Sequence, residues 1–198
     1  MKKILLLLLC VPLLGFSQME KRIALVIGNA NYDLGELKNP VNDALLVSRT
    51  LKSLKFEVIL DTNITDKVSF IKTIREFGER RLDYDVALVY YAGHGVQINS
   101  ENYLFPTKEI FQTEYDVRDY GISVQNIMRY LCGDTNYYNS LFSFSTLSGD
   151  VAADGDGENS LYCKYLCKNM MIKDISLDQM FRNVRNEIRI ETDGNQVS

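Results

Sequence analysis

Three short apolar runs, separated by two segments with helical spacing, constrain the fold of this chain most strongly. The runs are residues 23–27, 56–60 and 86–91, and short runs rich in branched residues are typical of buried strands. A helical repeat of apolar residues begins after Asn39-Pro40, and a second helix is predicted over residues 66–81. This alternation predicts a parallel sheet with helices on both faces.

The rest of the chain predicts elements of both kinds. They are a hairpin of residues 96–98 and 103–105, a helix over 122–131, a strand over 141–146, and helices over 160–171 and 176–189. The fold class is therefore α/β, a three-layer α/β/α sandwich with a mainly parallel sheet. The composition, 46% hydrophobic and 24% charged, is ordinary for a single globular domain.

The N-terminus has the layout of a secretory signal peptide. Met1-Lys2-Lys3 is basic, residues 4–14 are apolar, and small residues follow, but the apolar stretch is too short to span a bilayer. We expect residues 1–18 to be removed, with Cys10 among them, and residues 19–198 to form one domain. An uncleaved anchor is the alternative. The mature protein is expected to be exported, with no membrane contact after cleavage.

Charge and cysteine content bound the partners and the redox state. The net charge of −4 argues against nucleic acid as a partner, because phosphate binding needs a basic face. The expected mature chain keeps Cys132, Cys163 and Cys167, an odd number that leaves at least one thiol unpaired in an oxidising compartment. Cys163 and Cys167 are helical neighbours that could approach each other, or they are small buried residues.

His94, in Tyr90-Tyr91-Ala92-Gly93-His94-Gly95, is the only histidine of the chain and follows the third predicted strand. Imidazole takes and returns a proton near neutral pH, and active residues of open parallel sheets gather at the carboxyl ends of strands. His94 is therefore a candidate catalytic base. A packed or surface histidine is the alternative.

Three segments in order resemble the caspase-like cysteine peptidases of bacteria, relatives of caspases and metacaspases. They are residues 21–32, residues 37–44 and Tyr91-Ala92-Gly93-His94-Gly95, and the resemblance extends over residues 21–189. It implies a caspase-like fold, a peptide or protein as substrate or partner, and a bacterial protein, which the signal-peptide layout predicts to be periplasmic or secreted. It also implies cysteine-type endopeptidase descent.

The resemblance assigns roles to three residues of this chain. His94 would be the base or acid of a cysteine–histidine dyad, and the backbone N–H of Gly95 would stabilise the oxyanion. Asp43 would form a pocket for a basic residue through a charge-assisted pair. A tight turn at Gly95, and a helix cap or dipole partner at Asp43, are the alternatives.

The expected nucleophile is missing. A cysteine is expected roughly 50 residues beyond the histidine, near position 144, and that window holds none. Residues 122–136 resemble the helix before the family's cysteine-bearing strand, and residues 142–149 resemble the strand after it. We therefore expect that this strand was excised between Asn136 and Leu141. The chain also stops soon after Arg189, before a closing loop and strand that relatives usually carry, so we expect the domain to be internally deleted and C-terminally short.

Other nucleophiles fit poorly. Cys132 lies 38 residues after His94, at the end of a predicted helix. The hydroxyls of Ser143, Ser145 and Ser148 are weaker nucleophiles than a thiolate. We expect a chain without peptidase activity. Such a chain would be a non-catalytic scaffold that binds a peptide or partner, or a decayed fragment. The alternative is an active peptidase that uses Cys132 or an unexpected nucleophile.

An acidic run resembles a set of oxygen ligands for calcium, which some metacaspases use. It comprises Asp150, Asp154, Asp156 and Glu158, but it lacks the glycine and terminal glutamate of an EF-hand loop. A solvated loop is the preferred interpretation, so no cofactor and no metal are expected, with calcium as the alternative. No glycine-rich phosphate loop supports a nucleotide-binding protein.

Overall fold

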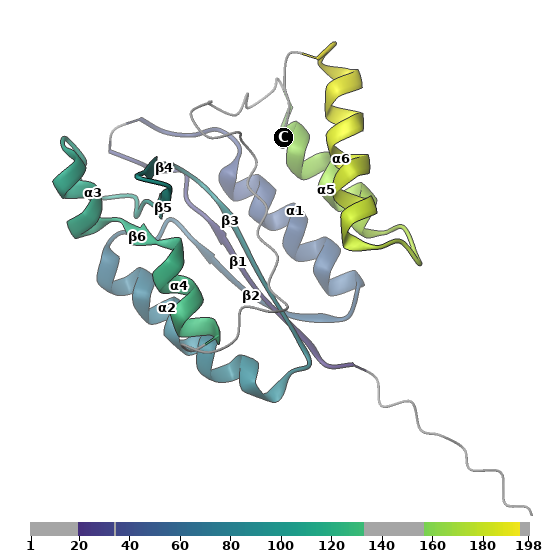
Figure 1. The fold of residues 1–198 in the computed structure, drawn as a ribbon, viewed down its shortest axis with the longest axis horizontal. Helices are drawn as coiled ribbons and strands as arrows, with labels where there is room; N and C mark the ends of the chain where they lie inside the picture. Colours follow the sequence, from purple (N-terminus) through teal and green to yellow (C-terminus); the bar gives the residue numbers. More distant parts are fainter. Residues whose placement is uncertain (1–19, 34, 133–156, 195–198) are drawn as a thin grey trace, which may run out of the picture.

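A computed structural model describes residues 20–33, 35–132 and 157–194, and it has a parallel sheet at its centre (Figure 1). Strand β1 (Arg22–Gly28) lies between β2 (Phe56–Thr62) and β3 (Val86–Ala92). The three strands are level, since Arg22 pairs with Phe56 and Val86. The predicted parallel arrangement is confirmed, and the carboxyl ends of all three strands meet at one edge.

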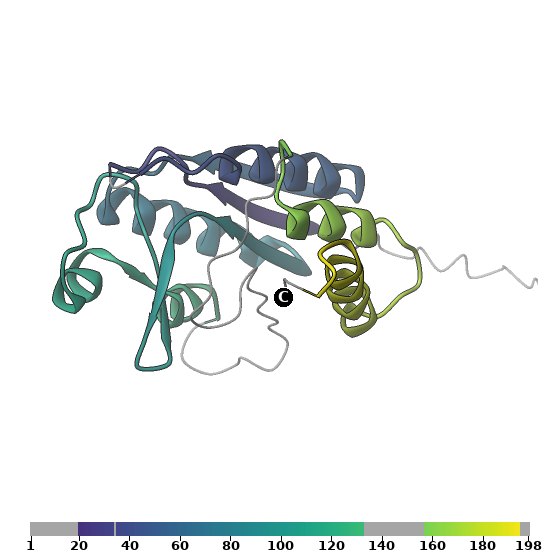
Figure 2. The same ribbon diagram turned by 90° about the horizontal axis from the view of Figure 1, so that it is seen from above.

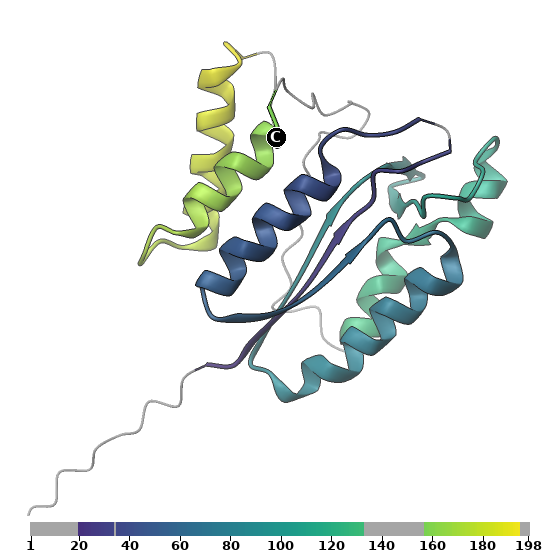
Figure 3. The same cartoon turned by 180° about the vertical axis from the view of Figure 1, so that it is seen from behind.

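Helices cover both faces of this sheet, as predicted. Helix α1 (Pro40–Ser53) covers one face, with α5 (Leu161–Met170) and α6 (Leu177–Glu191) beside it (Figure 3). Helix α2 (Lys67–Arg80), followed by the 3-10 turn η1 (Arg81–Asp83), and α4 (Val124–Cys132) cover the other face, and Figure 2 shows the layers from above. The three-layer sandwich is therefore confirmed.

The side chains of β1 explain why its sequence is a continuous apolar run. Ile23, Leu25 and Ile27 pack into the cluster beneath α2 and α4, whereas Ala24 and Val26 pack beneath α1 and α5. All five are essentially inaccessible to solvent. Burying a large aliphatic side chain stabilises a fold by about 1.5–3 kcal/mol, so β1 is the main apolar anchor for both helical layers.

Local signals place the helix starts. Asp66 begins α2 by accepting a hydrogen bond from Ser69 N, and Ser176 begins α6 by accepting one from Gln179 N. Helix α1 begins instead with Pro40, and it passes so close to β1 that a Cβ on Gly28 would lie 2.6 Å from the Pro40 carbonyl oxygen. A glycine at the end of β1 is therefore required by the crossing.

A second, antiparallel sheet follows β3. The predicted hairpin is confirmed as β4 (Gly95–Ile98) and β5 (Glu101–Leu104). The helix predicted over residues 122–131 begins later, because Ile122–Ser123 forms strand β6 beside β5 and buries Ile122 in the core. The sequence analysis did not anticipate α3 (Glu114–Tyr120), which Thr113 and Asp116 begin with a reciprocal capping box.

Several predictions fall outside the described residues: the signal peptide, the strand over residues 141–146, the three candidate serines and most of the acidic run. Within residues 20–33, 35–132 and 157–194, no helix is long and apolar enough to cross a membrane.

Candidate functional site around His94

His94 lies between the end of β3 and the start of β4, at the carboxyl edge of the parallel sheet, and its side chain is half-buried. Both backbone groups of His94 are hydrogen-bonded. Its N–H donates to the Tyr32 hydroxyl at 2.8 Å. Its carbonyl oxygen accepts from the Tyr91 hydroxyl at 2.7 Å and from the Phe105 N–H at 3.0 Å. The backbone at His94 is therefore held from both sides.

The two phenol groups also contact each other. The Tyr32 and Tyr91 hydroxyl oxygens are 3.0 Å apart, and they lie 3.2 Å and 3.1 Å from the Phe105 carbonyl oxygen. Burial raises the pKa of Tyr32 to about 12 and that of Tyr91 well above its ordinary value. Both hydroxyls therefore keep their protons at physiological pH and remain able to donate.

Gly93 makes room for this arrangement. Its φ is +155°, and a Cβ at this position would lie 2.5 Å from the Tyr32 hydroxyl and 2.6 Å from the Tyr91 hydroxyl. Any side chain would collide with the two oxygens. The Tyr32 ring also packs on the His94 imidazole, with ring centroids 4.5 Å apart and planes tilted by 57°.

Asn29 joins the same edge from the end of β1, and its side chain is fully buried. Its amide Nδ2 donates to the Phe105 carbonyl at 3.0 Å, and its Oδ1 accepts from Ile64 N at 3.0 Å. Its backbone N–H donates to the Ala92 carbonyl at 2.8 Å. Asn29 therefore ties three loops of the carboxyl edge together. The sequence analysis gave Asn29 no role; a polar residue shortly after the apolar run at residues 23–27 was the available signal.

Gly95 begins β4 and is exposed. A Cβ there would lie 2.8 Å from the Tyr103 carbonyl oxygen of the neighbouring strand. The close approach of the hairpin strands accounts for a glycine at this position, and its part in an oxyanion site stays a prediction.

Asp43 lies on α1, on the face of the sheet that α5 covers, and it is 4% exposed. Its carboxylate accepts hydrogen bonds from Ser160 N at 3.0 Å, from Ser160 Oγ at 2.6 Å and from Asn159 Nδ2 at 2.9 Å. These donors come from the residues that begin α5. The pocket for a basic residue stays a prediction, but in this structure the carboxylate is engaged by the chain itself.

Cys163 and Cys167 lie on α5 and are both buried. They belong to the apolar cluster beneath α1, whereas Tyr91 packs into the cluster on the other face of the sheet. The Cys163 thiol donates to the Asp43 carbonyl oxygen at 3.5 Å. A hydrogen bond with Cys167 and burial raise the pKa of the Cys163 thiol, which makes it a poor nucleophile.

Cys132 is the last residue of α4, and only its backbone is described. A Cβ on Gly78, near the end of α2, would lie 3.0 Å from the Tyr130 carbonyl oxygen. Helix α2 ends just before β3 begins, so α4 also ends near the amino edge of the sheet, as Figure 1 shows. A seven-residue strand is roughly 20 Å long. That length separates the end of α4 from the His94 edge.

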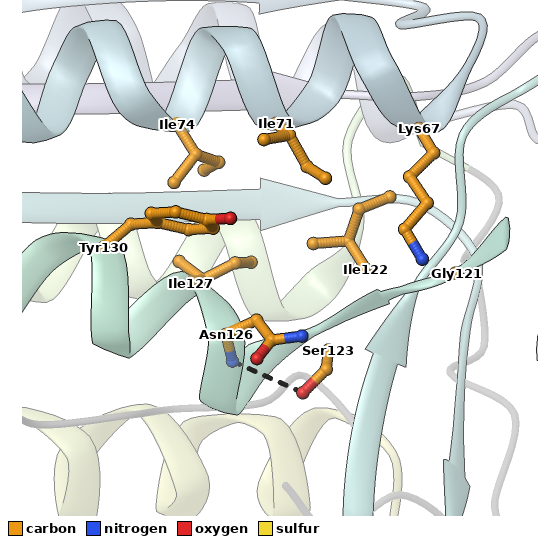
Figure 4. A pocket seen from close by; sticks show the side chains of 9 residues that line it. All are labelled: Lys67, Ile71, Ile74, Gly121, Ile122, Ser123, Asn126, Ile127 and Tyr130. Carbon is orange, nitrogen blue, oxygen red and sulfur yellow. Dashed lines mark hydrogen bonds between the residues drawn. The ribbon is translucent and has the colours of Figure 1, made fainter. Parts of the chain in front are cut away.

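A small pocket lies between α2 and α4, and His94 is not among the residues that line it (Figure 4). Ile71 and Ile74 of α2 face Ile127 and Tyr130 of α4, and Lys67 closes one end. Its volume is about 30 Å³, which suits a single water molecule and no peptide. The Lys67 ammonium donates to the Asp119 carbonyl oxygen at 2.7 Å and is therefore engaged by the chain itself. We interpret this small pocket as a gap in the packing of α2 against α4.

The fold and this edge define an α/β/α protein whose polar residues gather where parallel strands end. The sequence model of the caspase domain family matches residues 21–137 and, in a second stretch, residues 130–198. The chain therefore belongs to the caspase domain family, and membership implies proteins as substrates. No curated protein sequence matches the chain significantly.

The two matched stretches overlap at residues 130–137. This overlap lies next to the position at which the sequence analysis expects an excised segment, between residues 136 and 141. The excision itself falls outside the described residues and stays a prediction.

Proposed function

We propose that this chain is a caspase-domain protein that descends from cysteine endopeptidases and does not itself hydrolyse peptide bonds. The observation that carries the proposal is a mismatch. The family histidine is held firmly by Tyr32 and Tyr91, whereas the two cysteines with described side chains are buried in α5 on the other face of the sheet.

Covalent catalysis of this kind needs a thiolate within hydrogen-bond reach of the imidazole. Cys163 meets neither condition, because its pKa is raised by its hydrogen bond with Cys167 and by burial, and its thiol points at the Asp43 carbonyl. Cys132 ends a helix near the opposite edge of the sheet. Among the residues that the structure describes, neither cysteine of α5 can serve His94 as a nucleophile, and a site that lacks a thiolate retains only binding and weak general-base assistance to water.

The remaining role is that of a scaffold that binds a peptide or protein at the His94 edge. The family relationship supports a partner of this class. A preference for basic residues would require Asn159 and Ser160 to release the Asp43 carboxylate. We further propose that the protein acts after export, because residues 1–18 have the layout of a signal peptide.

The test is a peptidase assay on purified residues 19–198 with arginine- and lysine-containing fluorogenic peptides, with and without calcium. We expect no turnover, while an active caspase-family peptidase serves as positive control. The Cys132→Ala and His94→Ala variants are assayed in parallel. Turnover that both variants abolish would overturn the proposal and identify Cys132 as the nucleophile. Turnover that only His94→Ala abolishes would instead indicate a serine or an activated water.

A cooperative urea transition of the same sample separates a folded scaffold from a decayed fragment. We expect one sharp transition, because β1 is buried on both faces. A gradual loss of structure would favour the decayed fragment.

A further inference from the structure

The surroundings of His94 contain two tyrosines that the family resemblance gave no role. Tyr32 lies in the loop after β1 and Tyr91 lies in β3, 59 residues further along the chain. The Tyr32 hydroxyl accepts the His94 N–H, and the Tyr91 hydroxyl donates to the His94 carbonyl. We call Tyr32 and Tyr91 the tyrosine pair. Through this pair, the His94 backbone donates one hydrogen bond from its N–H and accepts another at its carbonyl oxygen.

The tyrosine pair is anchored independently of His94. The two hydroxyls are within hydrogen-bond distance of each other and of the Phe105 carbonyl oxygen, which Asn29 also holds. Tyr91 packs against the buried cluster that contains Phe70, and Tyr32 is itself buried. A displacement of His94 would therefore break bonds to groups that cannot follow it.

The pair also acts on the imidazole. The Tyr32 ring lies against the His94 ring, with centroids 4.5 Å apart. Gly93, directly before His94, lets both hydroxyls approach the backbone more closely than any other residue would allow. Backbone and ring contacts together restrict where the imidazole can lie at the carboxyl edge.

We propose that Tyr32 and Tyr91 are positioning residues for His94, and that they set its backbone conformation and the orientation of its imidazole. The proposal rests on His94 being the functional residue of the site named under the proposed function. The positioning of His94 is measured by NMR and not by peptidase activity. A failure of the positioning proposal can therefore be distinguished from a failure of the proposed function. A purely structural role, in which the tyrosines only hold the Phe105 loop, is the competing explanation.

His94 is the only histidine, so its imidazole signals in a proton NMR spectrum need no assignment by mutation. The experiment compares Tyr32→Phe, Tyr91→Phe and the double variant with the wild-type chain of residues 19–198. The readouts are the chemical shifts of the imidazole Cε1–H and Cδ2–H and the hydrogen exchange rate of the His94 amide.

We expect the His94 amide to exchange about tenfold faster in Tyr32→Phe, because its acceptor is lost. Tyr91→Phe should shift the imidazole resonances, since the His94 carbonyl keeps only the Phe105 donor. The changes in chemical shift and exchange rate in the double variant should be smaller than the sum of those in the single variants, because the two hydroxyls contact each other.

Two control variants separate positioning from general stability. Tyr115→Phe removes the hydroxyl of a tyrosine that is 79% exposed on α3, and it should change nothing. Ser160→Ala removes a hydrogen bond at the start of α5, a helix whose cysteines pack into a different cluster from that of Tyr91. This variant should be less stable, and it should leave the His94 signals in place.

The proposal would be overturned if both tyrosine variants fold and keep the imidazole chemical shifts and the His94 amide exchange rate of the wild type. Changes of equal size in Ser160→Ala would overturn it as well, because they would report lower stability alone. If Tyr91→Phe does not fold, Tyr32→Phe decides the question, since the Tyr32 hydroxyl accepts the His94 N–H directly.

Discussion

Ser160, at the start of α5, donates two hydrogen bonds to the Asp43 carboxylate in α1, one from its backbone N–H at 3.0 Å and one from its hydroxyl at 2.6 Å. The two residues are 117 positions apart. Asp43 belongs to the first stretch matched by the family and Ser160 to the second. This contact therefore attaches the start of α5 to α1, one of the helices that cover the sheet.

Replacing Asp43 with Asn should destabilise the fold by about 2–3 kcal/mol, because one acceptor becomes a donor that faces the Ser160 donors in a buried site. The free energy of unfolding in urea, monitored by circular dichroism, measures this effect. Asp178→Asn is the matched control, because Asp178 is exposed on α6. A loss at Asp43 no larger than that of the control would contradict the structural role of this carboxylate.

Replacing Gly93 with Ala should lower the free energy of unfolding by about 3 kcal/mol or more. The alanine backbone would have to keep a positive φ, and its Cβ would collide with the two tyrosine hydroxyls. Gly35→Ala is the control for backbone strain alone: Gly35 has a φ of +139°, and nothing lies within 4 Å of its virtual Cβ. Urea unfolding of the two variants separates strain from collision. Equal losses in both would show that the hydroxyls can move aside.

Cys163 and Cys167 should resist thiol reagents in the folded protein and react fully once it is unfolded in urea. Both side chains are buried, and a hydrogen bond with Cys167 together with burial raises the pKa of Cys163. The same hydrogen bond lowers the pKa of Cys167, so Cys167 is protected by its burial alone. Mass spectrometry of alkylated peptides identifies which cysteine has reacted. Rapid alkylation of Cys163 under native conditions would show that α5 detaches readily, and it would weaken the argument against this thiol.

The N-cap Asp66 should make stability fall in acid. Hydrogen bonds from the Ser69 N–H and hydroxyl lower the pKa of Asp66 in the folded state. The unfolded chain therefore binds this proton at higher pH, so the stabilisation is present above the unfolded pKa and is lost as pH falls through the folded pKa.

Asp66→Asn keeps a capping oxygen but removes the charge, so it should be less sensitive to acid than the wild type below about pH 5. Urea unfolding at several pH values measures the difference. Asp178→Asn again serves as the control for an exposed carboxylate outside the cap position. If the free energy of unfolding of Asp66→Asn depends on pH as that of the wild type does, Asp66 does not contribute to the loss of stability in acid.

The order of strands and helices could be predicted from local periodicity alone. The run at residues 23–27 is apolar at every position because both faces of β1 are covered, and that is the pattern expected of a central parallel strand. Asp66, Ser160 and Ser176 each precede an apolar repeat, which is the usual sequence signal of a helix start. His94 was placed at the carboxyl edge for the same reason, because β3 ends just before it.

Local patterns could not show which distant segments meet. Ile122 and Ser123 continue a helical repeat in sequence, yet β5 offers them hydrogen-bond partners and they become a strand. Tyr32 meets Tyr91 across 59 residues, and Asp43 meets Ser160 across 117.

The physical reason is that a buried polar group must find its partner wherever the packed elements place one. Periodicity reports which face of an element is apolar, and it carries no record of the element that will lie opposite. The sequence alone therefore determined the layers and the position of His94 along the chain. Only the tertiary structure decided that two tyrosines hold His94 and that α5 occupies the carboxylate of Asp43.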